Sequence, residues 1–191
     1  MRFYKIKGEK VGLAVITRED LPKFVEWLND PEVSIYLDPT RIFHMEDEEE
    51  GYESMRKSDR DIVLAIVTLP EEELIGSIGL HITSRWSGSA ELGIFIGRKE
   101  YWGKGYGREA IKLMLDFGFN VLGLEHVWLR VKDFNKRAIR CYKAVGFREV
   151  GRLRKAARQP DGRHDVLIMD ILREEFNGKH KSRFREIQER A

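Results

Sequence analysis

The chain has 191 residues, 42% of them hydrophobic and 35% charged, and its 34 basic and 32 acidic side chains leave a net charge of +2. This length suits one domain with a buried core, and the balanced charge argues against nucleic-acid binding. The single cysteine, Cys141, cannot form an internal disulfide, and the sequence has neither a signal-like start nor 18 consecutive apolar residues. We therefore expect a cytoplasmic protein without membrane partners. Its abundant Glu, Lys and Arg favour the ion-pair networks of a heat-adapted, thermostable protein.

The N-terminal half of the chain predicts several strands and one clear helix. Apolar runs indicate strands at 11–17, 62–69, 74–83 and 90–96, with a shorter strand at 3–6 and a turn at 70–73. Thr17 to Asp20 resembles a capping box, and it is followed by the apolar face of a helix that ends at 29–31: Leu21, Phe24, Val25 and Leu28. Residues 31–57 are expected to form a connection or short helices, and they include the acidic run Glu46–Glu50.

A glycine-rich loop follows the strand at 90–96. Gly103, Gly105 and Gly107 lead directly into a helical stripe made by Ile111, Met114, Leu115, Gly118, Phe119 and Leu122. A strand, a glycine loop and a helix N-terminus together favour phosphate binding, because free backbone N–H groups and the helix dipole converge on an anion. Glycines also let a ligand approach the backbone closely. The loop therefore predicts a nucleotide-like ligand that carries phosphate groups.

Three other interpretations of this loop fit less well. A Walker A loop needs Ser or Thr after Gly-Lys, but here Gly105 follows Lys104. A dinucleotide loop needs its third glycine one residue later, although Glu125 lies where the ribose-binding acid is expected. A glycine turn without a ligand is the last alternative, and its three glycines would weaken the start of the helix for no gain.

A second motif lies on a later helix. Asn135 is a good N-cap, Gly146 ends the helix, and one apolar face carries Ala138, Ile139 and Tyr142. Alone, this is an ordinary amphipathic helix, in which a buried tyrosine is more often core than catalyst. A half-buried strand at 126–131 precedes the helix. Strands at 147–154 and 166–172 follow it around a turn at 159–162, and the tail from Arg173 is charged and helix-prone.

The two motifs together resemble those of the GNAT superfamily of acyl-CoA-dependent N-acyltransferases. Its pyrophosphate loop reads Gln or Arg, two residues, Gly, one residue, then Gly or Ala; Gly105 and Gly107 match, and Trp102 replaces the Gln or Arg. Its later motif is matched by Asn135, Ala138, Tyr142, Gly146 and Phe147. Segments 90–94, 116–119 and 161–166 are similar to the branch of ribosomal-protein N-terminal acetyltransferases and spermidine N-acetyltransferases. Segment 97–101 is one residue longer than in many relatives.

The resemblance implies an α/β (α+β) fold with a mixed, largely antiparallel twisted sheet of about 6–7 strands. Helices should flank this sheet, and a splayed cleft should hold acetyl-CoA. One domain is expected at 1–175, followed by a charged tail at 176–191. The expected cofactor-binding residues are Phe95, Ile96, Gly97, Trp102, Gly103, Lys104, Gly105, Tyr106, Gly107, Arg108, Asn135 and Tyr142.

Acetyl transfer to an amine requires a base for the amine, donors for the developing oxyanion and a proton for the departing thiolate. By resemblance, Tyr142 is the catalytic proton donor, and a backbone N–H at Phe95 or Ile96 is the oxyanion donor. Glu91 is the candidate catalytic base, acting through a water, and its alternative is a solvated or structural carboxylate. His81 is a second candidate.

The acceptor is expected to be a primary amine, either a protein N-terminal α-amine or a polyamine. We favour the protein amine, because the strand and tail match that branch slightly better. The run Glu46–Glu50 could attract a cationic acceptor or be a solvated helix face, Asp38 could face the acceptor channel, and His164 and Asp165 could shape its end or stabilise a turn. No metal is expected, because no Cys or His pair has ligand spacing. A homodimer is an open alternative, and a non-catalytic acyl-CoA-binding regulatory module is the rival from another class.

Overall fold

The computed structural model describes residues 2–37 and 40–190, so Asp38 lies outside the described residues. Contacts within the chain define two compact units. The first unit comprises residues 1–79 and 94–110, and the second comprises residues 80–93 and 111–191. The expected site residues are therefore distributed over both units.

The first unit begins with the hairpin of β1 (Tyr4–Lys7) and β2 (Val11–Ala14), and β2 also pairs antiparallel with β3 (Asp61–Thr68). Within the described residues, four helices lie between β2 and β3: η1 (Arg18–Asp20), α1 (Leu21–Asn29), α2 (Pro31–Ser34) and α3 (Met45–Lys57). The helix α1 buries Leu21, Phe24 and Trp27 in a core completed by Ala14, Ile16, Ala65 and Val67. This core holds the helix against the strands through apolar burial.

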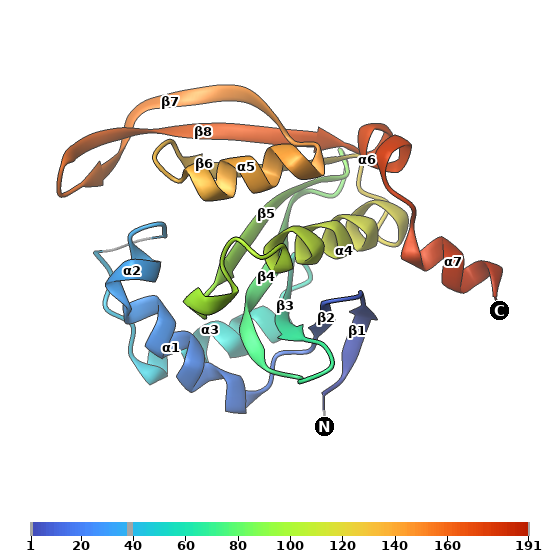
Figure 1. Cartoon of the computed structure of the whole chain (residues 1–191), viewed down its shortest axis with the longest axis horizontal. Coiled ribbons are helices and arrows are strands. Elements are labelled where there is room, and N and C mark those ends of the chain that lie inside the picture. The colour runs from blue at the N-terminus through green and yellow to red at the C-terminus, as the bar shows by residue number, and fades with distance from the viewer. Residues whose placement is uncertain (1, 38–39, 191) are drawn as a thin grey trace. The chain divides into compact units, whose positions relative to one another are not determined.

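The second unit contains a long antiparallel hairpin, β7 (Arg148–Gln159) and β8 (Gly162–Leu172), and β8 also pairs with β6 (His126–Lys132). The register of β7 shifts between Leu153 and Ala157, and Lys155 has a positive φ of 56°. Figure 1 shows β7 bowing away from β8 near its middle, as expected for such a bulge. The unit also contains α5 (Lys136–Val145), α6 (Arg173–Lys179) and α7 (Arg183–Glu189).

Three elements pass from one unit into the other: β4 (Leu74–Ser84), β5 (Ser89–Ile96) and α4 (Tyr106–Asn120). Over the described residues, the sheet has eight strands in the order β1-β2-β3-β4-β5-β6-β8-β7. In the second unit, β5 pairs parallel with β6 from Ser89↔His126 to Glu91↔Trp128. The short helix η2 (Lys99–Tyr101) follows β5 in the chain.

The structure corrects several boundaries predicted from the sequence. The sheet has eight strands where about 6–7 were expected, because the short strand near the N-terminus does form. β2 ends at Ala14 instead of Thr17, and the hairpin of β7 and β8 extends far beyond 147–154 and 166–172. Most of β7 is exposed, so its polar residues carry little of the burial pattern that identifies a strand.

Candidate active site

The glycine loop has a backbone that ordinary residues rarely adopt. Gly103 and Gly105 have φ values of +73° and +92°, in the left-handed region that favours glycine. The carbonyl oxygen of Gly105 accepts a hydrogen bond from the Glu109 N–H at 3.0 Å, so the first turn of α4 begins at this glycine. Gly107 lies within α4, where an added Cβ would make ordinary contacts with Ile94 and Ile96. The loop therefore presents the N-terminus of a helix of 15 residues, as anion binding requires.

Trp102 anchors the loop to the end of β5. Its indole Nε1–H donates a hydrogen bond to the Ile96 carbonyl oxygen at 2.7 Å. Its ring packs edge-on against Tyr36, with centroids 6.2 Å apart. The side chain that replaces the family's Gln or Arg is thus engaged within the first unit, and it shapes the loop by joining the strand end to it.

A lysine from the β1–β2 turn also reaches this loop. The Lys10 Nζ donates a hydrogen bond to the Lys104 carbonyl oxygen at 3.2 Å and lies 5.7 Å from the centroid of the Tyr106 ring. The Lys10 backbone N–H donates to Glu109 Oε2 at 3.0 Å, so the carboxylate of α4 fixes the turn that carries this lysine. A cation beside a helix N-terminus is unfavourable unless an anion joins it. Lys10 is not predictable from the sequence alone, because no local pattern reveals a partner so distant in the chain.

The end of β5 is packed on α1. Phe95 lies edge-on to both Phe24 and Trp27, with ring centroids 5.9 and 6.5 Å away. The Gly97 N–H donates to the Ile75 carbonyl oxygen at 2.8 Å, and a Cβ on Gly97 would overlap the Trp27 ring. Phe95, Ile96 and Gly97, the three residues at and just after the end of β5 that were predicted to contact the cofactor, are therefore held by aromatic packing and by hydrogen bonds to their backbone.

The second motif forms the predicted capped helix. The Asn135 side chain accepts a hydrogen bond from the Ala138 N–H at 3.2 Å, and Gly146 ends α5 with a φ of +133°. Tyr142 is 8% exposed and packs against Phe147, with ring centroids 5.9 Å apart. Burial raises the pKa of the Tyr142 hydroxyl well above its ordinary value. The phenol is therefore a protonated, neutral donor at physiological pH.

The two candidate bases have different surroundings. Glu91 is half-buried, and its Oε1 accepts a hydrogen bond from Arg130 Nε at 2.8 Å. One carboxylate oxygen thus lies in an ion pair between β5 and β6 that the sequence analysis did not foresee. His81 is exposed on β4. Neither position shows which side chain takes the proton from the amine, so the choice of Glu91 over His81 as general base stays a prediction.

The acidic run lies in the first half of α3. Acidic residues at the start of that helix and basic residues at its end match the helix dipole. Burial raises the pKa of Glu48, and the Asp47 carboxylate accepts a hydrogen bond from the His44 N–H at 2.8 Å. The acidic run therefore helps to start α3, and its predicted attraction for a cationic acceptor is a separate question.

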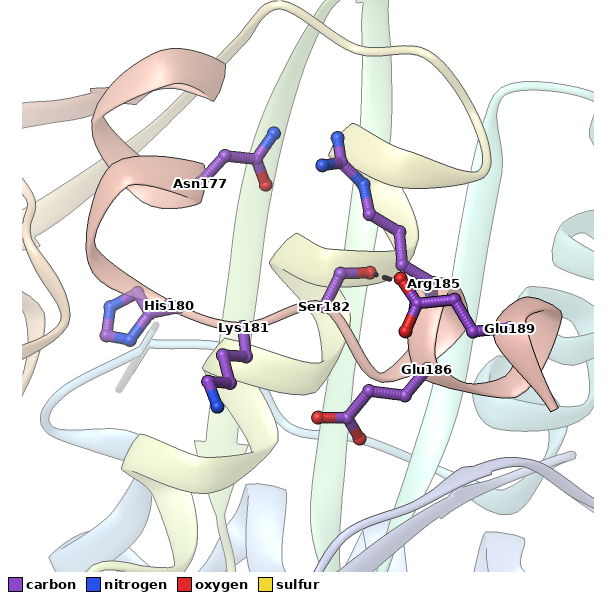
Figure 2. Close-up of a pocket in the computed structure, with 7 residues that line it drawn as sticks. All are labelled: Asn177, His180, Lys181, Ser182, Arg185, Glu186 and Glu189. Carbon is purple, nitrogen blue, oxygen red and sulfur yellow. Dashed lines mark hydrogen bonds between the residues drawn. The ribbon is translucent and has the colours of Figure 1, made fainter.

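A cavity of about 360 Å³ lies at the C-terminal tail. Figure 2 shows its lining side chains, which come from α6, α7 and the segment between them: Asn177, His180, Lys181, Ser182, Arg185, Glu186 and Glu189. None of these residues was predicted to contact the cofactor or acceptor. The described part of the chain contains no helix long and apolar enough to cross a membrane, and no group of three or more His, Cys, Asp or Glu residues that could hold a metal ion.

Known proteins are similar to this chain over most of its length. The family described as acetyltransferase (GNAT) domain matches residues 10–148. The uncharacterized N-acetyltransferase p20 of Bacillus licheniformis is 26% identical over 173 residues, which cover 89% of this chain and 97% of that protein. The spermidine N(1)-acetyltransferase of Escherichia coli K12 is 34% identical over 93 residues, 49% of this chain and 50% of that protein.

A solved structure shows the same similarity at the level of the fold. The spermidine N-acetyltransferase of Vibrio cholerae, in complex with CoA and spermine, has a TM-score of 0.80 and 27% identity, covering 87% of this chain and 98% of that one. The chain therefore belongs to the GNAT acetyltransferase family. The predicted fold is confirmed, and so is the predicted class of an N-acetyltransferase that uses acetyl-CoA as co-substrate.

Proposed function

We propose that this chain is a polyamine N-acetyltransferase that transfers acetyl from acetyl-CoA to a primary amine of a spermidine-like acceptor. The observation that carries the proposal is the likeness to the Vibrio cholerae spermidine N-acetyltransferase over 98% of that chain. The partial match to the Escherichia coli spermidine enzyme points the same way. The sequence alone favours a protein N-terminal amine as acceptor, but the similarity to spermidine N-acetyltransferases supports the polyamine alternative better.

In this proposal, the pyrophosphate of acetyl-CoA binds the loop from Gly103 to Arg108. Backbone N–H groups at the start of α4 and the nearby Lys10 ammonium supply the positive potential that a pyrophosphate needs. Trp102 acts by holding the loop to the end of β5. Phe95, Ile96 and Gly97 take the acyl arm, with a backbone N–H at Phe95 or Ile96 as oxyanion donor. Asn135 and Tyr142 complete the predicted set.

Tyr142 is the proposed proton donor to the CoA thiolate. The hydroxyl is protonated at neutral pH, as a general acid must be before the C–S bond breaks, because the ordinary phenol pKa is near 10 and burial raises it further. The amine first loses a proton and then attacks the thioester carbonyl to form the tetrahedral oxyanion. Collapse of the oxyanion breaks the C–S bond and expels the thiolate, which takes the phenolic proton of Tyr142. The protonated amide nitrogen then loses its second proton to solvent, and the Tyr142 phenolate regains a proton from solvent, so that one proton is released per acetyl group transferred.

Glu91 is the proposed site for the acceptor's positive charge, with two roles left to experiment. Its carboxylate could relay the proton of the amine through a water, since its second oxygen is not the one bonded to Arg130. It could also attract a polycation electrostatically. The polyamine acceptor suits the second role, because spermidine-like amines are cationic at neutral pH.

The proposal is tested by free-thiol release from acetyl-CoA with a panel of acceptors. Spermidine and spermine should give turnover with the larger kcat/KM, and peptides that begin with Ala or Ser should give less. The reverse order would restore the protein-amine hypothesis. Binding of CoA without thiol release for any amine would favour the non-catalytic module instead.

A further inference from the structure

His164 is held between two carboxylates on separate segments of the second unit. Its Nδ1 lies 3.2 Å from Asp133 Oδ1, in the segment that joins β6 to α5. Its Nε2 lies 2.9 Å from Asp161 Oδ1, in the turn that joins β7 to β8. The imidazole also packs edge-on against Phe134, with ring centroids 4.9 Å apart. The ring therefore joins the tip of the β7–β8 hairpin to the segment that leads into α5.

The segment that His164 contacts is the turn that sets the start of α5. The Asn135 N–H donates to the Lys132 carbonyl oxygen at 2.9 Å, which closes the turn around Asp133 and Phe134. Asp133 is fixed to β8 by two further hydrogen bonds: its N–H donates to the Asp165 carbonyl oxygen at 3.0 Å, and its Oδ2 accepts from the Asp165 N–H at 3.3 Å. The next residue after the turn is the N-cap Asn135. His164 therefore provides two of the contacts that hold this turn, one to Asp133 and one to Phe134, and the turn fixes the start of α5.

Protonation decides how many of these contacts His164 can make. The imidazolium has two N–H donors and can serve both carboxylates, whereas neutral imidazole has one donor and can serve only one. Asp161 and then Asp133 raise the pKa of His164 above its ordinary value, since both hydrogen-bond to its charged form. The third nearby carboxylate, Asp165, is engaged by the Lys155 N–H at 2.8 Å and by Arg152 at 3.3 Å. Arg163, the neighbour of His164 on β8, faces Arg158 in the β7 register.

We propose that His164 is a positioning residue for the transfer reaction: it clamps the Asp133–Asn135 turn to the β7–β8 turn and so orients α5 with its proton donor Tyr142. The clamp is complete when both imidazole nitrogens carry protons. A raised pKa in the folded protein means that this stabilisation is fully present below the ordinary histidine pKa near 6.5, and is lost as pH rises through the higher folded value. The inference rests on the proposed role of Tyr142, and its structural part can be tested without activity.

The test compares wild type with His164→Gln, whose amide has donors on a single nitrogen and never carries charge, so it cannot donate from two separate ring positions as the imidazolium does. At pH 6, kcat should fall about three- to tenfold, because misplacing a catalytic group raises the barrier without weakening ground-state binding. CoA affinity should stay within about twofold of wild type. The ratio of mutant to wild-type kcat should rise toward one as pH passes the folded pKa of His164. A ratio that stays near one at every pH would overturn the proposal.

Two activity-free measurements accompany the kinetics. Hydrogen exchange of the Ala138 N–H, which caps α5 through Asn135, should be faster in His164→Gln than in wild type at pH 6. NMR titration of the imidazole should give a pKa above the ordinary value in wild type, and a lower one in Asp161→Asn, which alters only the exposed end of the clamp. Unchanged exchange, or a titration unaffected by Asp161→Asn, would contradict the clamp.

Together, these measurements distinguish a failure of the proposed acetyltransferase function from a failure of the proposed role of His164. If wild type releases no thiol with any amine, the proposed function fails, while exchange and titration still decide whether the clamp exists. If wild type acetylates polyamines and Tyr142→Phe is impaired, but His164→Gln is indistinguishable from wild type, only the role of His164 fails. Asp161→Asn also serves as the folding-safe variant, because its side chain is 73% exposed.

Discussion

The most informative perturbation of the glycine loop, Gly103 to Arg108, is Gly105→Ala. At a φ of +92°, an alanine costs about 1–2 kcal/mol of folding free energy through backbone strain. The added Cβ would meet only the flexible Lys10 Nζ, at 3.8 Å, so the protein should still fold. If the pyrophosphate binds this loop as proposed, that Cβ would occupy space that the pyrophosphate needs. We expect CoA binding to weaken at least about tenfold, which corresponds to about 1.4 kcal/mol.

The assay is calorimetric titration of CoA into each variant, with Gly123→Ala as the matched control. Gly123 has a φ of +72°, and a Cβ there would meet nothing within 4 Å. Alanine at Gly123 should therefore bring comparable backbone strain, outside the loop, and leave CoA affinity unchanged. Equal CoA affinities for the two variants, both folded, would refute the placement of the pyrophosphate on this loop.

Three further predictions test other parts of the molecule. Lys10→Met should weaken CoA binding about fivefold, or about 1 kcal/mol, at low salt and less at high salt, measured by calorimetry with Lys7→Met as the control. Glu91→Gln should lower kcat/KM most at low pH if the Glu91 carboxylate is the general base. If the carboxylate only attracts the cationic acceptor, the variant should instead have a raised KM, and added salt should abolish that difference from wild type. A pH–rate profile identical to that of wild type, at low and at high salt, would exclude both roles. Asp116→Ala should destabilise the fold by about 2–3 kcal/mol in urea unfolding, because buried Asp116 accepts hydrogen bonds from the Arg183 N–H and from Asn120; an unchanged midpoint would contradict this.

Much of the fold follows from local sequence signals. Asn135 and Gly146 set the limits of α5 by capping chemistry. The predicted apolar stripe of α4 is correct for Ile111, Met114, Leu115 and Phe119, which are buried, but wrong for Leu122, which is exposed beyond the end of the helix at Asn120. The predicted apolar face of α1 is correct for Leu21 and Phe24, whereas Val25 and Leu28 are only partly buried and Trp27, which was not predicted, completes the buried face. No local sequence pattern shows that residue 97 must be glycine. The requirement arises only in the folded chain, where the Trp27 ring leaves no room for a Cβ at this position.

The candidate site was predictable where it depends on short motifs and unpredictable where it depends on tertiary contacts. Gly103 and Gly105 were identified because their spacing before a helix is informative by itself. Lys10 and Arg130 were not, since each meets its partner only after strands far apart in sequence have paired. The domain boundary at 175 stays a prediction, and α6 runs across it. Cytoplasmic location, heat stability and a homodimer also stay predictions.

The measurement that tests the central claim most directly is the paired kcat and CoA dissociation constant of Tyr142→Phe, with spermidine as acceptor at neutral pH. The substitution removes one hydroxyl from a buried ring and keeps its packing against Phe147. If Tyr142 protonates the departing thiolate, kcat should fall about 10²- to 10⁴-fold, while the dissociation constant changes little, because the hydroxyl matters in the transition state. A Phe variant that acetylates spermidine at the wild-type rate would contradict the account and make Tyr142 a packing residue.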